Sequence, residues 1–186
     1  MRRRRKWPWF ALATLLCCCG CPAWFGMPYY EQFPSGVVIP QTVGDLRLRE
    51  DAASKAAAEK LKLEVRGDNW LAQDTFAALF TDGNGKRATV YGRTGVQWSL
   101  DSAVVEEINR VSGRYGLSDI QPVDGTLRDE QRRCGVGRED GVSVVVCSWA
   151  DHGSVGTGVF TRLDVADSNN RLTLLRDTLV TRQAQK

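Results

Sequence analysis

The start of the chain joins a cluster of basic residues to a long uncharged segment. Met1–Lys6 reads MRRRRK, and no charged residue occurs from Trp7 to Tyr30. As a helix, roughly 22 residues of this segment extend about 33 Å, which matches the hydrocarbon core of a bilayer. Aromatic residues, which favour membrane interfaces, occur near both of its ends. We therefore expect residues 1–30 to form a basic tip and a transmembrane segment, with residues 7–28 inside the membrane.

Basic clusters stay on the cytoplasmic side of a membrane, so Met1–Lys6 predicts that the remainder of the chain lies outside. The expected location is the cell membrane, with a single pass. Three alternatives remain open. Gly20-Cys21 resembles the end of a lipobox, which predicts a lipoprotein anchored at Cys21, and a cleaved signal peptide would begin in the same way. The arginine run is also compatible with a twin-arginine signal, although the residues that follow fit it poorly. All of these possibilities export the rest of the chain.

The distribution of charge argues against a nucleic-acid partner. The net charge is +3, and the five consecutive basic residues from Arg2 to Lys6 more than account for it. The rest of the chain is therefore slightly acidic. A domain that binds nucleic acid carries its basic excess on the folded part, so we expect no nucleic acid here.

After the hydrophobic segment, the composition predicts a linker, one domain and a short tail. Residues 31–45 contain two prolines and two glycines, which favour a linker. We expect an extracytoplasmic domain over residues 46–182 and a flexible tail over 183–186. A chain of 186 residues is long enough for one domain of ordinary size and an anchor.

The hydrophobic patterns predict an α+β domain. Leu100, Val104, Ile108, Val111 and Tyr115 recur at helical spacing and predict a helix with one apolar face. Two hairpins and two further helices complete the order, which favours an antiparallel sheet built from the hairpins with the helices packed on one face. The other elements are expected as helices at Arg49–Lys62 and from Asp167 or Ser168 onward, and as strands at Thr75–Phe80, Lys86–Gly92, Val142–Trp149 and Ser154–Leu163.

Two cysteines of the exported region predict a crosslink. Cys134 and Cys147 are its only cysteines, and thiol pairs outside the cytoplasm tend to oxidise. Redox-active pairs usually lie two residues apart at the start of a helix, so this wider spacing favours a structural disulfide. The cysteines of the hydrophobic segment are not expected to bind metal, because consecutive cysteines of a helix point in different directions.

His152 is the only histidine, and it lies between Asp151 and Ser154. These are the residue types of a hydrolase triad, but neighbours within one turn rarely align as a triad requires. We expect a polar turn in which Asp151 accepts hydrogen bonds from backbone amides. The glycines from Gly153 to Gly158 precede no helix, so a phosphate loop is not expected either. The sequence thus predicts no catalytic, cofactor-binding or metal-binding residues.

Exposed aromatic and imidazole side chains are the candidates for a binding surface. Trp70 lies beside Asp68 and Asn69, in a polar setting that favours exposure. Trp149 follows a continuous apolar run and is expected in the core. Trp70 and His152 are therefore the predicted contact residues.

The run CSWADHGSVG from Cys147 to Gly156, with Arg133-Cys134-Gly135 before it, resembles a pattern in small membrane-anchored or exported proteins of actinobacteria. The resemblance covers mainly residues 133–156 and the basic-then-apolar start. It implies an extracytoplasmic location and a disulfide, and it implies no activity.

Together these patterns favour a membrane-anchored extracytoplasmic accessory domain, not an enzyme, that binds a protein or an envelope component. A carrier of a small ligand or lipid is the alternative, and it requires an apolar pocket beneath the helices. A hydrolase centred on His152 is the third and least favoured hypothesis.

Overall fold

The computed structural model describes residue 14 and residues 35–67 and 72–182. The expected membrane segment, apart from Thr14, lies outside the described residues, as do Trp70 and the tail 183–186. Among the described residues, no helix is long and apolar enough to cross a membrane.

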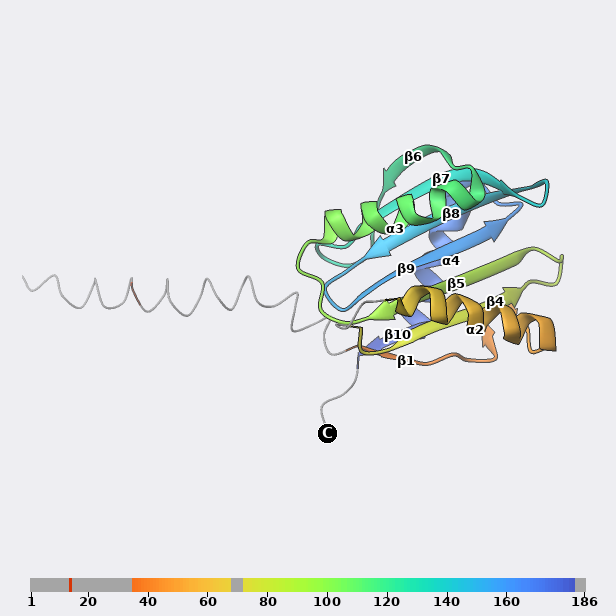
Figure 1. Cartoon of the computed structure of the whole chain (residues 1–186), viewed down its shortest axis with the longest axis horizontal. Helices are drawn as coiled ribbons and strands as arrows, with labels where there is room; N and C mark the ends of the chain where they lie inside the picture. The colour runs from red at the N-terminus through yellow and green to blue at the C-terminus, as the bar shows by residue number, and fades with distance from the viewer. Residues whose placement is uncertain (1–13, 15–34, 68–71, 183–186) are drawn as a thin grey trace, which may run out of the picture.

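An antiparallel sheet of eight strands forms the centre of the domain (Figure 1). The two predicted hairpins, β4–β5 and β8–β9, are present and lie side by side because β5 pairs with β9. Further strands extend the sheet at both edges. In spatial order the strands are β2 (Thr42–Val43), β3 (Leu46–Leu48), β4 (Thr75–Thr81), β5 (Arg87–Thr94), β9 (Ser154–Thr161), β8 (Val142–Ala150), β7 (Gln131–Glu139) and β6 (Ser118–Val123).

Helices cover both faces of this sheet, so the prediction that they pack on one face is wrong. Helices α2 (Ala52–Arg66) and α3 (Leu100–Tyr115) lie on one face, and α4 (Val165–Leu179) lies on the other (Figure 1). Strand β8 shows the reason. Val144 and Val146 pack in the core beneath α2 and α3, whereas the alternate residues pack in the core beneath α4. A strand that is apolar on both faces requires cover on both.

Helix α3 has the predicted bounds, and its predicted apolar stripe is buried. It ends at Gly116, whose φ of 56° is the left-handed conformation that glycine adopts easily. The other two helices begin at aspartates that cap them. Asp51 accepts hydrogen bonds from the amide and hydroxyl of Ser54 at 3.0 and 2.7 Å, and Asp164 accepts from the amide of Asp167 at 2.7 Å. Each cap satisfies a backbone donor that the first helical turn leaves unpaired.

A second, two-stranded sheet joins the beginning and the end of the described domain. Strand β1 (Ser35–Val37) pairs with β10 (Val180–Arg182). The described part of the expected linker, residues 35–45, therefore contributes β1 and β2 to the fold. We call the end of the domain where β1 begins and β10 stops the proximal end, and the opposite end the distal end (Figure 1). The turns 95–99, 124–130 and 151–153 all lie at the proximal end.

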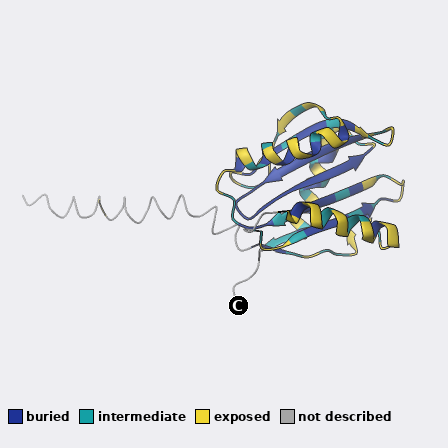
Figure 2. Cartoon of the chain, viewed as in Figure 1, coloured by how far each residue is buried: buried dark blue, intermediate teal, exposed yellow. Residues whose placement is uncertain are grey.

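The predicted disulfide between Cys134 and Cys147 is present. The two residues face each other across β7 and β8, with their Cα atoms 4.0 Å apart, and both are buried. Cys134 lies in β7 and Cys147 in β8. Most residues of the central strands are buried, whereas most exposed residues lie on the outer sides of the helices and on the edge strand β6 (Figure 2).

Candidate functional site

The turn that carries His152 is buried and does not form a triad. Ser154 Oγ donates directly to Asp151 Oδ2 at 2.7 Å, whereas His152 Nδ1 lies 3.2 Å from the backbone carbonyl of Gln97. As predicted, Asp151 accepts backbone hydrogen bonds, from the amides of Gly153 and Ser154 at 2.8 Å each. His152 is only 6% exposed, so it offers little surface for a partner.

A buried ion cluster, formed by Glu130, Arg132, Asp151 and Arg176, lies next to this turn. Arg176 donates to Asp151 at 2.7 Å, and Arg132 Nε donates to Glu130 at 2.7 Å. Arg176 Nε also lies 3.9 Å from Glu130, which links the two pairs. Two cations and two anions balance within the cluster. Charges this deeply buried are tolerated only when they are paired, so the cluster fastens α4 to the proximal turns.

Glu130 is the carboxylate on which this cluster depends. Burial alone would raise its pKa, but the hydrogen bond and charge of Arg132, together with the charge of Arg176, hold the pKa of Glu130 below its usual value. Its second oxygen accepts from the amides of Thr126 and Leu127, at 2.8 and 3.1 Å. Glu130 is therefore ionised at neutral pH and also shapes the turn 124–130.

The glycines between Gly153 and Gly158 have a packing role. A Cβ at Gly156 would lie 2.5 Å from the ring of Trp149, and one at Gly158 would lie 2.8 Å from the side chain of Leu172. These glycines therefore make room for the core beneath α4. Both glycines lie in β9.

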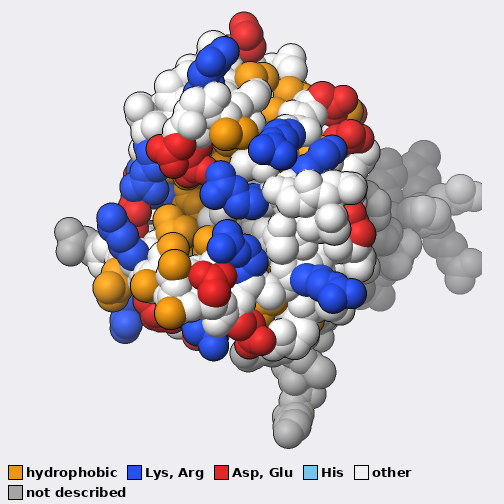
Figure 3. Space-filling model, turned by 90° about the vertical axis from the view of Figure 1, so that its right-hand side faces the viewer, with side chains coloured by type: hydrophobic (Ala, Val, Ile, Leu, Met, Phe, Trp, Pro, Cys, Tyr) orange, Lys and Arg blue, Asp and Glu red, His pale blue; other side chains and the backbone are white. Residues whose placement is uncertain are grey.

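The face of the sheet that carries α2 and α3 has a depression at its distal end (Figure 3). The depression holds a small hollow of about 30 Å³. Its floor consists of Leu79, Thr89, Val159 and Thr161, and Arg49, Arg87 and Glu139 stand around it. Figure 3, which faces the distal end, shows hydrophobic side chains in a depression bordered by charged ones. We call this feature the helix-flanked groove.

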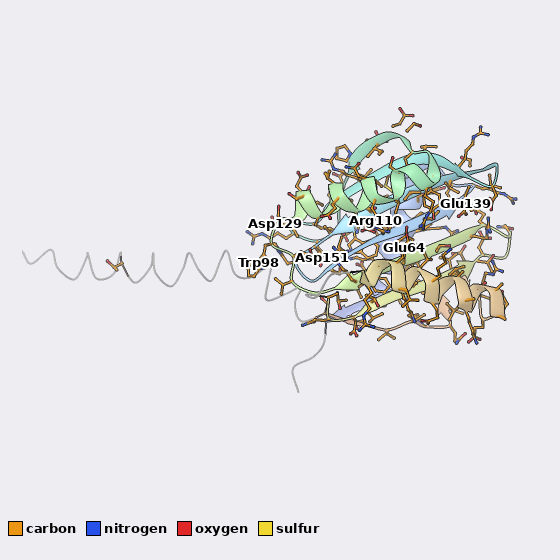
Figure 4. The ribbon with its side chains drawn as sticks, viewed as in Figure 1. Glu64, Trp98, Arg110, Asp129, Glu139 and Asp151 are labelled. Atoms are coloured by element: carbon orange, nitrogen blue, oxygen red, sulfur yellow. A yellow bond between two sulfur atoms is a disulfide. The ribbon has the colours of Figure 1, made fainter. Side chains whose placement is uncertain are left out.

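A network of charged residues lines the groove between the two helices. Glu107 of α3 is nearly buried and accepts from Arg110 at 2.6 Å and from Thr157 of β9 at 2.8 Å. Arg110 also lies 3.4 Å from Glu64 of α2, which bonds to Arg114 as well. Figure 4 shows Glu64 and Arg110 between the helices and Glu139 toward the distal end. This network holds α2 and α3 at a fixed spacing across the groove.

Tyr91 lies under this network with its hydroxyl unpaired. The residue has no exposed surface, and its hydroxyl has no hydrogen-bond partner among the described residues. The guanidinium of Arg110 stands 5.8 Å above the ring centre, a cation–π distance. Burial, with smaller contributions from Tyr115 and Glu107, raises the pKa of the Tyr91 phenol. The phenol therefore stays neutral in the folded protein.

The predicted contact residue Trp70 lies outside the described residues, but the structure exposes a different tryptophan. Trp98 lies in the turn 95–99 at the proximal end and is 76% exposed. Sequence reasoning did not assign it, although its setting between a glycine and the start of α3 marks it as a turn residue. Trp149, expected in the core, is fully buried beneath α4.

The described residues contain no group of three or more His, Cys, Asp or Glu side chains placed to hold a metal ion. Comparisons of the chain with protein-family models, with curated proteins and with solved structures find no match.

Proposed function

We propose that this chain is a membrane-anchored extracytoplasmic binding domain that holds a protein or envelope component in the helix-flanked groove. The observation that carries the proposal is the groove itself, with a floor of Leu79, Val159 and two threonines and a border of charged side chains. Binding sites are usually concave surfaces that combine apolar side chains with a few polar groups. The basic and uncharged start of the chain and the buried disulfide support the location.

The filled interior favours this function over a lipid carrier. A carrier would need an apolar cavity between a helix and the sheet. The layer beneath α4 is instead occupied by Trp149, Phe160 and three leucines of α4, all fully buried. The layer beneath α3 is filled in the same way by the apolar stripe of that helix. The open groove is the better place for a ligand.

The location is tested with a cysteine placed on the surface. Lys60 is exposed on α2, so Lys60→Cys presents a reactive thiol, whereas Cys134 and Cys147 are buried. We expect a membrane-impermeant maleimide to label Cys at position 60 on intact cells, as read by peptide mass. The unsubstituted chain is the control. Labelling only after the cells are permeabilised would place the domain in the cytoplasm and end the proposal.

The groove is tested with a photoreactive residue in the full chain in native membranes. Benzoylphenylalanine at Arg87 reports on the border of the groove, and the same residue at Asn170, exposed on α4, is the matched control. We expect a crosslinked product at position 87 only, and its loss when Thr89→Trp fills the floor. Equal products at both positions, or a product that Thr89→Trp leaves unchanged, would show that the groove is not the site.

A further inference from the structure

The turn between β4 and β5 presents an asparagine that has a glycine on either side. Residues 82–86 read DGNGK, and the turn lies at the distal end of the domain (Figure 1). Gly83, Asn84 and Gly85 are all exposed. A Cβ added at Gly83 or Gly85 would meet nothing within 4 Å, so neither glycine packs against the rest of the domain. Exposed loop tips with small residues are the most accessible parts of a folded chain.

The side chain of Asn84 is free to rotate, although the backbone that carries it is held. The side-chain amide makes no hydrogen bond to any described residue, whereas the backbone amide of Asn84 donates to Asp82 Oδ1 at 2.8 Å. The same oxygen accepts from the amide of Lys86 at 2.9 Å. The carboxylate of Asp82 therefore keeps the turn in place while the Asn84 side chain changes its rotamer without breaking a contact.

The backbone nitrogen of Gly85 is the group that the Asn84 side chain can meet. Gly85 has no Cβ to shield this nitrogen, and its φ of 74° is a conformation that glycine adopts easily. Its amide donates one hydrogen bond, to the carbonyl of Asp82, and the length of 3.2 Å is at the upper end of the normal range. A single bond of this kind in an exposed turn opens at little cost in free energy.

The other described asparagines lack this combination. Asn109 and Asn170 are exposed, but they lie within α3 and α4, where the amide of the following residue bonds to a carbonyl of the helix. Asn169 uses both ends of its side-chain amide. Its Oδ1 accepts from Arg132 at 3.0 Å, and its Nδ2 donates to the carbonyl of Asp124 at 3.1 Å.

We propose that Asn84 is a site of spontaneous deamidation. The nitrogen of Gly85 loses its proton to hydroxide and forms a bond to Cγ of Asn84, while the bond from Cγ to the side-chain nitrogen breaks and ammonia leaves. Water then opens the cyclic imide at one of its two carbonyls. One opening gives aspartate at position 84, and the other gives isoaspartate, in which the backbone runs through the former side chain. In total, one water is consumed and one ammonia is released, so no oxidant or cofactor is required.

Either product adds a negative charge at the distal end, close to the helix-flanked groove. Arg87 follows the turn directly and stands at the hollow of the groove, where it lies 3.9 Å from Glu139. Isoaspartate also adds a methylene to the backbone of the turn that Asp82 holds. The modification therefore changes both the charge and the backbone beside this border of the groove. The inference depends on neither the proposed anchor nor the proposed partner.

The test incubates the purified full chain in heavy-oxygen water at pH 6 and at pH 9, and follows the asparagine peptides by mass. We expect the amide of Asn84 to be replaced by an acid roughly tenfold faster or more than those of Asn109 and Asn170, because an exposed turn opens more often than a helix. The rate should rise with pH, since the nitrogen of Gly85 must lose its proton. Chromatography should separate two products, and incorporated heavy oxygen shows that they formed during the incubation.

Asn84→Gln is the matched variant, because it keeps a side-chain amide but places it one methylene farther from the backbone, which slows ring closure. This variant should stay unmodified at position 84 and unfold at the same urea concentration as the unsubstituted chain. Equal rates at Asn84, Asn109 and Asn170 would overturn the proposal, as would an Asn84 that reacts in urea but not in the folded chain. Aspartate as the only product would indicate direct hydrolysis of the side chain and overturn the route through Gly85.

Discussion

Tyr91 and Glu130 are both buried polar residues, and they differ in what surrounds them. The hydroxyl of Tyr91 has no partner among the described residues, whereas Glu130 accepts from Arg132 and from two backbone amides. A buried polar group without a hydrogen bond lowers the stability of the folded state. When such a group is fully hydrogen-bonded, its hydrogen bonds offset the free-energy cost of removing it from water. The two residues should therefore respond to substitution in opposite directions.

Tyr91→Phe should raise the free energy of unfolding by about 1–2 kcal/mol, because it removes an unpaired hydroxyl and keeps the ring beneath Arg110. The raised pKa of Tyr91 adds a dependence on pH. The folded protein holds the phenol proton more tightly than the unfolded chain does. The stability that depends on the neutral phenol is therefore present below the unfolded pKa near 10, and it is lost as the pH rises through the pKa of the folded state. Urea unfolding at pH 8 and above pH 10 measures both effects. Tyr115→Phe is the matched control, and an equal gain there would contradict the explanation.

Glu130→Gln should destabilise the protein by about 3–5 kcal/mol at neutral pH, because it leaves the buried charge of Arg132 without its carboxylate partner. The lowered pKa of Glu130 means that its stabilising effect is present above the unfolded value near 4.3 and is lost as pH falls through the folded value. Thermal unfolding between pH 3 and 7 should show a flatter acid slope in the variant. Glu139→Gln, on the surface, should change stability little, and a similar loss there would contradict the role of the buried ion cluster.

Strand β7 shows at the scale of elements why part of the fold was not predicted. Its sequence QRRCGVGRE reads as a charged loop, yet Arg132 is buried. Arg132 is satisfied by Asn169 and Thr173 of α4, at 3.0 and 2.6 Å, and no local pattern can indicate partners so far along the chain. By contrast, α3 was predicted in full because its apolar spacing is local. The hairpin turn at Asp82 is also held by local contacts, since its carboxylate accepts from the amides of Asn84 and Lys86.

The continuous apolar run of β8 already indicated that helices cover both faces of the sheet, although we predicted helices on one face only. Such a run indicates burial on both faces, which conflicts with helices on one face only. The helix-flanked groove depends on that two-sided arrangement, because it lies on the face that α4 leaves to α2 and α3. The buried ion cluster could not be assigned from sequence, since it depends on turns and a helix that meet only in the folded chain.

The disulfide joins elements that already pair, and it should still contribute to stability. Replacing Cys134 and Cys147 together by alanine should lower the free energy of unfolding by about 3 kcal/mol, because the unfolded chain loses a closed loop. Urea unfolding under oxidising conditions measures the difference. Both sulfurs are buried, so a reductant should open the native bond only when urea is present. Rapid reduction without urea would contradict the burial of the bond.

Residues 35–67 and 72–182 form two sheets of very different size. The eight-stranded sheet has cores on both faces, whereas β1 and β10 pair over three residues each. The edge strand β6 of the eight-stranded sheet contains Pro122 and pairs with β7 in an irregular register, which discourages pairing with another chain. Stability should therefore be high in the large sheet and low in the small one.

Hydrogen exchange followed by mass spectrometry should show this division. Peptides that cover β1 and β10 should exchange their amides much faster than peptides that cover β8 and β9, because opening three residue pairs exposes little core. The two hairpin strands β8 and β9 serve as the protected reference within the same molecule. Equal protection of both regions would mean that the small sheet opens only when the entire domain unfolds.

The pairing of β1 with β10 also has a mechanical consequence. A pull on the chain from its N-terminal side acts first on the three residue pairs that begin at Ser35, not on the eight-stranded sheet. Rupture of those pairs and of the bond from Val38 to Leu179 would release residues 35–41, up to about 25 Å of extended chain, before β2 carries any load. The small sheet would thus act as an extensible link that yields under tension while the folded body stays intact.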